Sequence, residues 1–297
     1  MDELIVSSRP ELRQPLLVAA FRGWNDGGQG ASLAGGYLAK AWEAERFAEI
    51  APDGFFDFQA VRPHVSLVEG VTRRIDWPEN AFFHASIPGL DRDAVLLLGI
   101  EPNMRWRTFA SLTVELARSL GVELVVTLGS LLADVPHTRP APVTAAATDP
   151  AVMERLGLEP SRYEGPTGIV GVLNDACTRE GLPSVGLWAA VPHYLSLAPS
   201  PRAALALCER LGQLIGCEIE TTELVEAVDA YNEQVSEAVA ADSETAAYVE
   251  ELEQRSDVFE QNLPSGETLA AELTRFLRER EEKGKDDEPG SKPPADE

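Results

Sequence analysis

The chain has 297 residues, 44% of them hydrophobic, and a formal net charge of -24 at pH 7. This length and apolar share allow one large folded domain, or one domain with an appendage. A chain this acidic offers no basic face to phosphate groups, so we expect neither nucleic acid nor an anionic membrane surface as a partner.

Targeting and disulfide signals also point away from membranes and secretion. No apolar run approaches the roughly 20 residues that span a bilayer, and the opening MDELIVSSRPELRQP lacks the basic and apolar regions of a secretory signal. The three cysteines, Cys177, Cys208 and Cys217, are too few and too irregularly spaced for a disulfide framework or a zinc site. We therefore expect a cytoplasmic protein.

Four continuous apolar runs predict buried parallel strands at residues 16–21, 94–100, 122–133 and 184–190. Helical patterns lie between them, at residues 28–44, 105–121, 165–181 and 199–216. The stretch 47–87 is rich in predicted strands, and residues 55–58 and 71–77 alternate as half-exposed strands do. A short helix is predicted near 150–156.

The character of the chain changes after residue 217. An apolar stripe at three- and four-residue spacing predicts amphipathic acidic helices; its members are Leu224, Val228, Tyr231, Val235 and Val239. A last helix is predicted across 266–280, and the charged, Pro- and Gly-containing end is typical of disorder. We thus expect an α/β domain at 1–217, an acidic helical region at 218–282 and a disordered tail at 283–297.

Each of the four apolar runs ends in a polar or Gly- and Pro-rich cluster. The carboxyl ends of parallel strands form one rim, where ligands usually bind. The sequence therefore predicts a shared site on this rim, with these tentative ligand-binding residues: Gly23, Trp24, Asn25, Asp26, Glu101, His137, Arg139, Gly165, Thr167 and His193.

Each candidate also has a plainer interpretation. Residues 23–28 can be a backbone nest that holds an anion, or a tight turn in which Asn25 or Asp26 caps the next helix. Glu101 can act chemically or join a buried ion pair. The two histidines can transfer protons or hydrogen-bond to loop carbonyls, and Gly165 with Thr167 can bind a ligand or start a helix.

The chain carries no complete catalytic set. A Gly-x-Ser-x-Gly nucleophile elbow and a P-loop are absent from the sequence, and its four histidines lack paired helical spacing. We therefore assign no catalytic residue, metal or cofactor, and a role without catalysis is the favoured interpretation.

With these residues in view, the chain resembles the PAC2 family (proteasome assembly chaperone 2-like), in its bacterial, actinobacterial-type branch. The matching motifs, in chain order, are FRGWNDGG (21–28), GIEP (99–102), LADVPHTRP (132–140), YEGPTGI (163–169) and VPHY (191–194). The resemblance implies a three-layer α/β/α fold, similar to nucleoside phosphorylases and nucleosidases, with an added C-terminal helical region. It also implies a homo-oligomer, for which we favour a trimer.

Two functional hypotheses follow, one from the resemblance, the acidic helices and the missing catalytic set, and one from the strand-end rim. Family members that chaperone proteasome subunits carry a C-terminal hydrophobic-Tyr-any motif, whereas this chain ends Pro294-Ala295-Asp296-Glu297, so we do not expect that mode of docking. We favour a homo-oligomeric protein-interaction or assembly-chaperone-like protein. The alternative is a nucleosidase-like enzyme that binds a small molecule in the strand-end pocket. In it, Glu101 or Asp26 is the acid or base or the partner of a sugar hydroxyl, and His137 and His193 are hydrogen-bond or proton-transfer groups.

Overall fold

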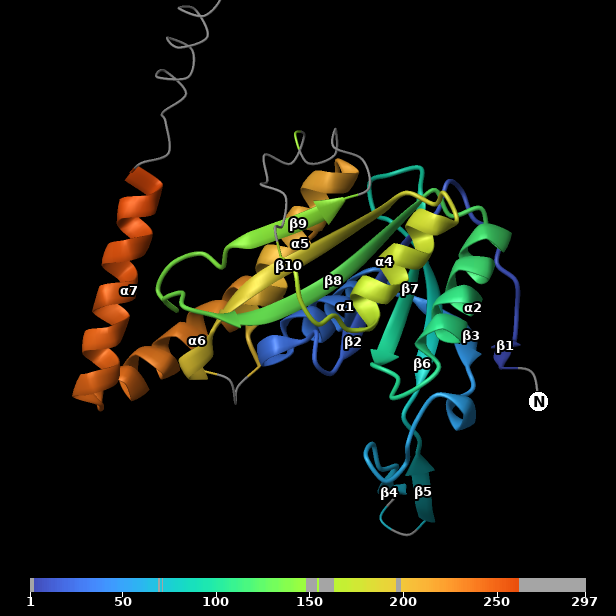
Figure 1. Ribbon diagram of the computed structural model, residues 1–297, viewed down its shortest axis with the longest axis horizontal. Coiled ribbons are helices and arrows are strands. Elements are labelled where there is room, and N and C mark those ends of the chain that lie inside the picture. Colours follow the sequence, from blue (N-terminus) through green and yellow to red (C-terminus); the bar gives the residue numbers. More distant parts are fainter. Residues whose placement is uncertain are drawn as a thin grey trace, which may run out of the picture.

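The computed structural model describes residues 3–68, 70, 72–147, 154, 163–195 and 199–261. In this part of the chain a mixed sheet of eight strands runs through the centre of the molecule, in the order β1-β3-β6-β7-β2-β8-β10-β9 (Figure 1). Its strands are β1 (Leu4–Val6), β2 (Leu16–Arg22), β3 (Glu45–Ile50), β6 (Asn80–Ser86), β7 (Asp93–Ile100), β8 (Leu124–Ala133), β9 (Val143–Ala147) and β10 (Ser184–Pro192).

The four predicted core strands are confirmed as the parallel centre of this sheet. β2 pairs in parallel with β7 and β8, and β8 pairs in parallel with β10. Alternate side chains of β2 enter opposite cores, with Leu16 and Val18 on one face and Leu17 on the other. Because both faces are covered, the strands are apolar throughout rather than alternating.

Helices cover both faces of the sheet, which confirms the predicted three-layer α/β/α architecture. The long helices are α1 (Gly30–Ala41), α2 (Trp106–Ser119), α4 (Ile169–Arg179), α5 (Pro201–Ile215), α6 (Thr222–Ala240) and α7 (Ser243–Gln261). Residues of α1 and α5 pack into one core, and residues of α2 and α4 into the other. None of the described helices combines the length and hydropathy needed to cross a membrane.

The predicted amphipathic helices after residue 217 are present as α6 and α7. Leu224 joins the core beneath α5, while Tyr231, Val235 and Val239 form a small separate core with Val249 of α7. Figure 1 shows the two helices extending away from the sheet. The division into regions at 217 and 282 stays a prediction. The predicted helix at 266–280 and the tail lie outside the described residues, as does the helix near 150–156 apart from residue 154.

The prediction of a strand at residues 55–58 is wrong. A short 3₁₀ helix at Pro52–Gly54 turns the chain, and the backbone N–H groups of Phe55 and Phe56 both donate to the Pro52 carbonyl, at 3.0 and 3.1 Å. The two rings are consequently both buried. Successive side chains of a strand point to opposite faces, so the apparent alternation of this segment does not reflect a strand.

The other half-exposed segment does form a strand. β5 (Thr72–Asp76) pairs antiparallel with β4 (His64–Val68) in a separate two-stranded sheet. This hairpin projects from the body of the molecule beyond the start of β6 (Figure 1).

Candidate functional site

The Glu101 carboxylate joins three of the predicted motifs at the end of β7. Its Oε1 atom accepts hydrogen bonds from Asn25 Nδ2 and from the Ile169 backbone N–H, both at 2.8 Å. Its Oε2 atom accepts the Trp24 backbone N–H at 3.1 Å. Parallel strands place these loops at one rim, as the sequence predicts, and Glu101 fastens them together.

Two glycines allow the backbone to approach Glu101 this closely. A Cβ atom on Gly168 would lie 2.4 Å from Asn25 Nδ2 and 2.5 Å from Glu101 Oε1. A Cβ atom on Gly23 would lie 2.8 Å from Glu101 Cβ, and the φ of Gly23 is +142°. The glycines of the FRGWNDGG and YEGPTGI motifs thus have a steric role around one carboxylate.

This arrangement bears on the anion-binding hypothesis for the Gly-rich loop. Ile169 is the first residue of α4, whose N-terminus attracts negative charge. Glu101 already supplies a carboxylate there, and it also accepts the Trp24 N–H of the predicted nest. Two of the donors that could have held a free phosphate, the Trp24 and Ile169 N–H groups, are bonded within the protein.

Asp26 caps helix α1, which matches the plainer interpretation of this residue. Its carboxylate accepts the backbone N–H groups of Ala31 at 2.9 Å and Ser32 at 3.1 Å, and the Ser32 hydroxyl at 2.6 Å. The Ser130 hydroxyl of β8 also donates to it, at 3.3 Å. A buried carboxylate with these donors is a structural anchor for the loop after β2.

Large apolar side chains are exposed around this polar cluster. Trp24 is 63% exposed and Tyr163 is 66% exposed, on the loops after β2 and before α4. Met104 follows Glu101 by three positions, and Leu131 and Leu132 lie near the end of β8; all three are exposed. Gly165 and Thr167 are also exposed, in the loop that leads from Tyr163 to α4. We refer to Trp24, Met104, Leu131, Leu132 and Tyr163 as the rim residues.

His137 lies apart from Glu101, in a buried polar contact with α6. The Tyr194 hydroxyl accepts the His137 backbone N–H at 2.9 Å and lies 2.9 Å from its Nδ1 atom. Because the Tyr194 hydroxyl accepts the backbone N–H, it can donate its own hydrogen to Nδ1 of the neutral ring. The ring proton is then on Nε2, which donates to Ser236 Oγ at 3.1 Å. The imidazole thus bridges α6 and the short 3₁₀ helix His193–Leu195 that follows β10, as a neutral ring.

Burial shifts the pKa values of His137 and Tyr194. The pKa of His137 is lowered, first because the charged ring is desolvated and then because the Arg202 cation lies nearby, while Glu253 opposes the change. Burial also raises the pKa of Tyr194 to about 12. Both groups are therefore neutral near pH 7. The ring nitrogens face the hydroxyls of Tyr194 and Ser236, and no acidic side chain of the described residues hydrogen-bonds to the imidazole to activate it as a base.

Arg139 and His193 contact α7 and its neighbours. Arg139 makes a two-pronged ion pair with Asp257 of α7, at 2.8 and 3.0 Å. His193 is partly exposed, with Nδ1 3.3 Å from the Asp134 carboxylate, and its ring contacts the ring of Tyr248 of α7 edge-on. These side chains attach the C-terminal helices to the ends of β8 and β10.

The ten candidates therefore fall into two groups by their contacts. One surrounds Glu101 and Asp26, where β2, β7 and α4 meet; the other holds His137, Arg139 and His193 against α6 and α7. Sequence analysis missed the partners Ile169, Ser236 and Asp257, because a backbone donor and residues of a distant helix carry no local signal. A ligand-binding role for any candidate stays a prediction.

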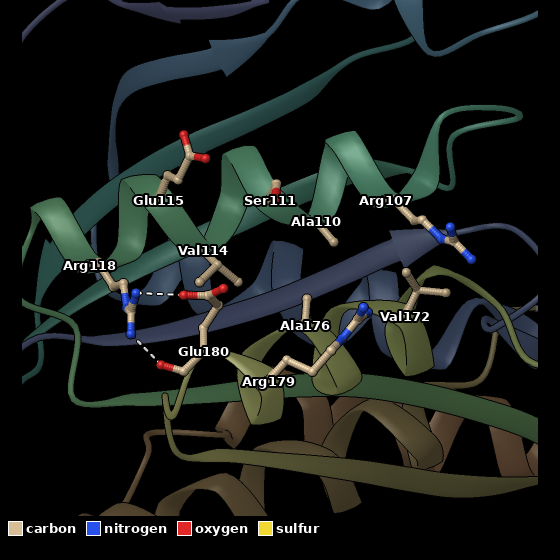
Figure 2. Close-up of a pocket in the computed structure, with 10 residues that line it drawn as sticks. All are labelled: Arg107, Ala110, Ser111, Val114, Glu115, Arg118, Val172, Ala176, Arg179 and Glu180. Carbon is tan, nitrogen blue, oxygen red and sulfur yellow. Dashed lines mark hydrogen bonds and ion pairs between the residues drawn. The ribbon is translucent and has the colours of Figure 1, made fainter.

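Cavities of the described residues lie mostly away from both groups. One of about 220 Å³ lies between α2 and α4, with apolar side chains between the helices and Arg107, Arg118 and Arg179 at its margins (Figure 2). Two others, of about 350 and 490 Å³, lie beside α1 and between α5 and the segment 138–143. Ser32 borders the first of these two, and Arg202 the second.

Comparisons with known proteins show which family the chain matches. Residues 20–239 match the PAC2 family, and a comparison with curated proteins gives no match. The structure is similar to that of a PAC2 family protein from Streptomyces avermitilis, at 48% identity and a TM-score of 0.73, over 79% of this chain and 99% of that one. It is also similar to a proteasome-assembly chaperone homologue from Mycobacterium tuberculosis, at 46% identity and a TM-score of 0.73, over 79% and 99%.

A more distant structure shows the fold alone. An archaeal proteasome activator from Pyrococcus furiosus has 19% identity and a TM-score of 0.64, over 79% of this chain and 97% of that one. The match to the family covers most of the chain, including every motif around Glu101. This protein belongs to the PAC2 family.

Proposed function

We propose that this protein works by binding other proteins, as a homo-oligomeric, assembly-chaperone-like member of its family, with a trimer favoured. The proposed partner site is the surface of rim residues around Glu101. One relative with 46% identity is a proteasome-assembly chaperone homologue. Proteasome subunits are therefore the first partners to test.

The observation that carries this proposal is the exposure of Trp24 and Tyr163 beside a rigid polar support. Exposed aromatic side chains are the residues that most often dominate the energy of protein interfaces. The loops that present them are fastened by Glu101, whose hydrogen bonds reach Trp24 and the first residue of α4. A pre-organised surface loses less conformational entropy on binding.

The nucleosidase-like alternative has no comparable support. Its two candidate carboxylates, Glu101 and Asp26, accept three and four hydrogen bonds from the protein itself. Its candidate proton-transfer group His137 is buried between Tyr194 and Ser236. These contacts favour a structural role for each residue.

The experiment compares the wild-type chain with a Trp24→Ser/Tyr163→Ser double variant. Each is mixed with purified proteasome α-type and β-type subunits from the same cell, and complex formation is followed by analytical ultracentrifugation. We expect the wild type to bind and the double variant to bind about tenfold or more weakly, because interface aromatics are hot spots.

An Ile5→Ser/Val6→Ser double variant is the matched control. These side chains are also large, apolar and exposed, but they lie on edge strand β1. We expect this control to bind like the wild type. Equal binding by all three chains would contradict the rim as the partner site. Gentle affinity purification that recovers only the protein itself would contradict a protein-binding function.

A further inference from the structure

The β4–β5 hairpin has one face that is apolar and uncovered. Val65, Leu67, Ile75 and Trp77 are each between 50% and 62% exposed. Val65 pairs with Ile75, and Leu67 pairs with Arg73, so the strand residues share one face of the pleat. We call Val65, Leu67, Arg73, Ile75 and Trp77 the hairpin face.

The polar contacts of the hairpin lie on its other face. Ser66 donates to the Asp76 carboxylate at 2.8 Å, and Arg74 pairs with the same carboxylate at 2.7 Å. On the hairpin face, the ring of Trp77 packs edge-on against the ring of Phe58, with 4.8 Å between the ring centroids. A two-stranded hairpin is marginally stable by itself, so this apolar face is suited to be covered by a partner.

Arg73 gives the hairpin face a positive charge. It is exposed opposite Leu67, and no ion pair involves it among the described residues, whereas its neighbour Arg74 is paired with Asp76. The covering partner is therefore expected to combine apolar contact with an acidic group for Arg73.

Helix α6 carries acidic groups that complement Arg73. Its exposed side presents Glu226, Asp229, Glu233 and Glu237 at three- and four-residue spacing. We call these four residues the α6 acidic stripe. Val225, which is also exposed, lies beside it.

Among the described residues, no basic side chain of the same copy pairs with the stripe. Ion pairs of α6 and α7 in the described part of the chain involve Glu223, Glu251, Glu253 and Asp257, none of which belongs to the stripe. Like charges at this helical spacing repel each other and destabilise the helix. A cation from outside the copy would relieve that repulsion.

We propose that the hairpin face of one copy docks on the α6 acidic stripe of a second copy. Figure 1 shows the hairpin and α6 on separate sides of the molecule, so the two surfaces do not meet within one copy. Contact between different surfaces of identical chains is head-to-tail, and it closes into a ring when the rotation between copies permits. This inference rests on the proposed homo-oligomer and names the surfaces that build it.

The test is the solution mass of the full chain, measured by light scattering across a dilution series. We expect a wild-type mass that is a multiple of 32.2 kDa. Arg73→Glu should raise the dissociation constant about tenfold or more, because it places like charges face to face. Arg73→Gln should weaken assembly less, and Leu67→Gln should weaken it by removing apolar contact.

Arg74→Gln is the matched control, since it changes the same residue type on the opposite face of the same strand. It should leave the mass unchanged. A charge exchange then identifies the partner surface: Glu233→Arg combined with Arg73→Glu should restore assembly that either variant alone disrupts. Restored assembly also shows that Arg73→Glu has not simply unfolded the hairpin.

The outcomes separate this inference from the proposed function. A wild-type assembly that survives both Arg73→Glu and Leu67→Gln overturns the hairpin contact while the homo-oligomer stands. Disruption by Arg73→Glu without rescue by Glu233→Arg overturns α6 as the docking surface. Equal disruption by Arg74→Gln overturns the assignment of the contact to the hairpin face, because Arg74 lies on the opposite face. A monomeric wild type overturns both the inference and the proposed homo-oligomer.

Discussion

Glu101 accepts the backbone N–H of Ile169 at 2.8 Å, across 68 positions of the chain. The bond joins the end of β7 to the first residue of α4, and the same carboxylate holds Asn25 and the Trp24 backbone. Three segments that are conspicuous in the sequence thus meet at one side chain. Their polar residues support the rim, and the exposed rim residues remain for contact with a partner.

Replacing Glu101 with Gln should destabilise the protein. One carboxylate oxygen becomes an amide group, which cannot accept the N–H donors that now face it. Charge-assisted hydrogen bonds of this kind contribute about 1.5–3 kcal/mol each, so we expect the free energy of unfolding to fall by about 2 kcal/mol or more in urea titrations. Glu115→Gln on the exposed side of α2 is the control and should change it by less than about 0.5 kcal/mol. Equal effects of the two variants would exclude a supporting role for Glu101.

Adding a methyl group at Gly168 should disturb the same cluster. The new Cβ atom would lie within 2.5 Å of Asn25 and Glu101 side-chain atoms, so one of these contacts must break. We expect a loss of about 1–3 kcal/mol, as for other overpacked sites. Thermal or urea unfolding measures it.

Gly36→Ala provides the opposite control. Gly36 is exposed within α1, and a Cβ atom there would meet nothing within 4 Å. Alanine in a helix interior is better than glycine by about 0.5–1 kcal/mol, so this variant should be stabilised. If both alanine variants shifted stability in the same direction, the steric account of Gly168 would be wrong.

The core strands and one part of the rim could be predicted from the sequence. Strands such as residues 16–21 are buried on both faces, so their continuous apolar pattern is local and unambiguous. The contact between Asn25 and Glu101 could also be predicted, because β2 and β7 are parallel neighbours and end at the same edge of the sheet. The turn at Phe55 and Phe56 was missed because tertiary burial of both rings, rather than local alternation, decides it.

The separation of His137 and Arg139 from Glu101 could not be predicted. Pairing of β8 with β10 continues to Ala133 and Pro192, whereas the ladder between β2 and β8 ends at Leu128. Because β8 and β10 are longer than β2, the loops that follow them lie farther along the sheet, where they contact α6 and α7. Strand ends that are equivalent in topology therefore lie at different places along the rim, and strand length relative to neighbours has no simple sequence signal.

Removing the Arg139 side chain should loosen α7. Its guanidinium group holds Asp257 with two hydrogen bonds, and this contact lowers the pKa of the Asp257 carboxyl. In Arg139→Ala we expect amides of α7 to exchange hydrogen several-fold faster while those of α5 keep their rates, because only the attachment of the outer helix is lost.

Arg255→Ala is the control for this effect. Arg255 pairs with Glu251 inside α7 itself, so its loss removes an exposed pair without detaching the helix. Hydrogen exchange measured by mass spectrometry should show α7 close to wild type in this variant. Acceleration of the same size in both variants would mean that Arg139 does not fix α7.

His137 should make the stability of the protein depend on pH. Its folded-state pKa lies below the unfolded value of about 6.5. The unfolded chain therefore takes up the proton first, and stability that is complete above about pH 6.5 should decrease as the pH falls through that value toward the folded-state pKa. Protonation would also place a hydrogen on Nδ1, and this nitrogen could then no longer accept the hydrogen bond from the Tyr194 hydroxyl.

The measurement is the free energy of unfolding at pH 7.5 and 5.5 for the wild type, His137→Gln and His193→Gln. The decrease between the two pH values should shrink in His137→Gln, which lacks the His137 imidazole, and should persist in His193→Gln, which keeps it. His137→Gln should also be less stable at pH 7.5, by about 1–2 kcal/mol, because it loses the fit between Tyr194 and Ser236. A wild-type pH dependence that survives unchanged in His137→Gln would show that another group titrates on unfolding.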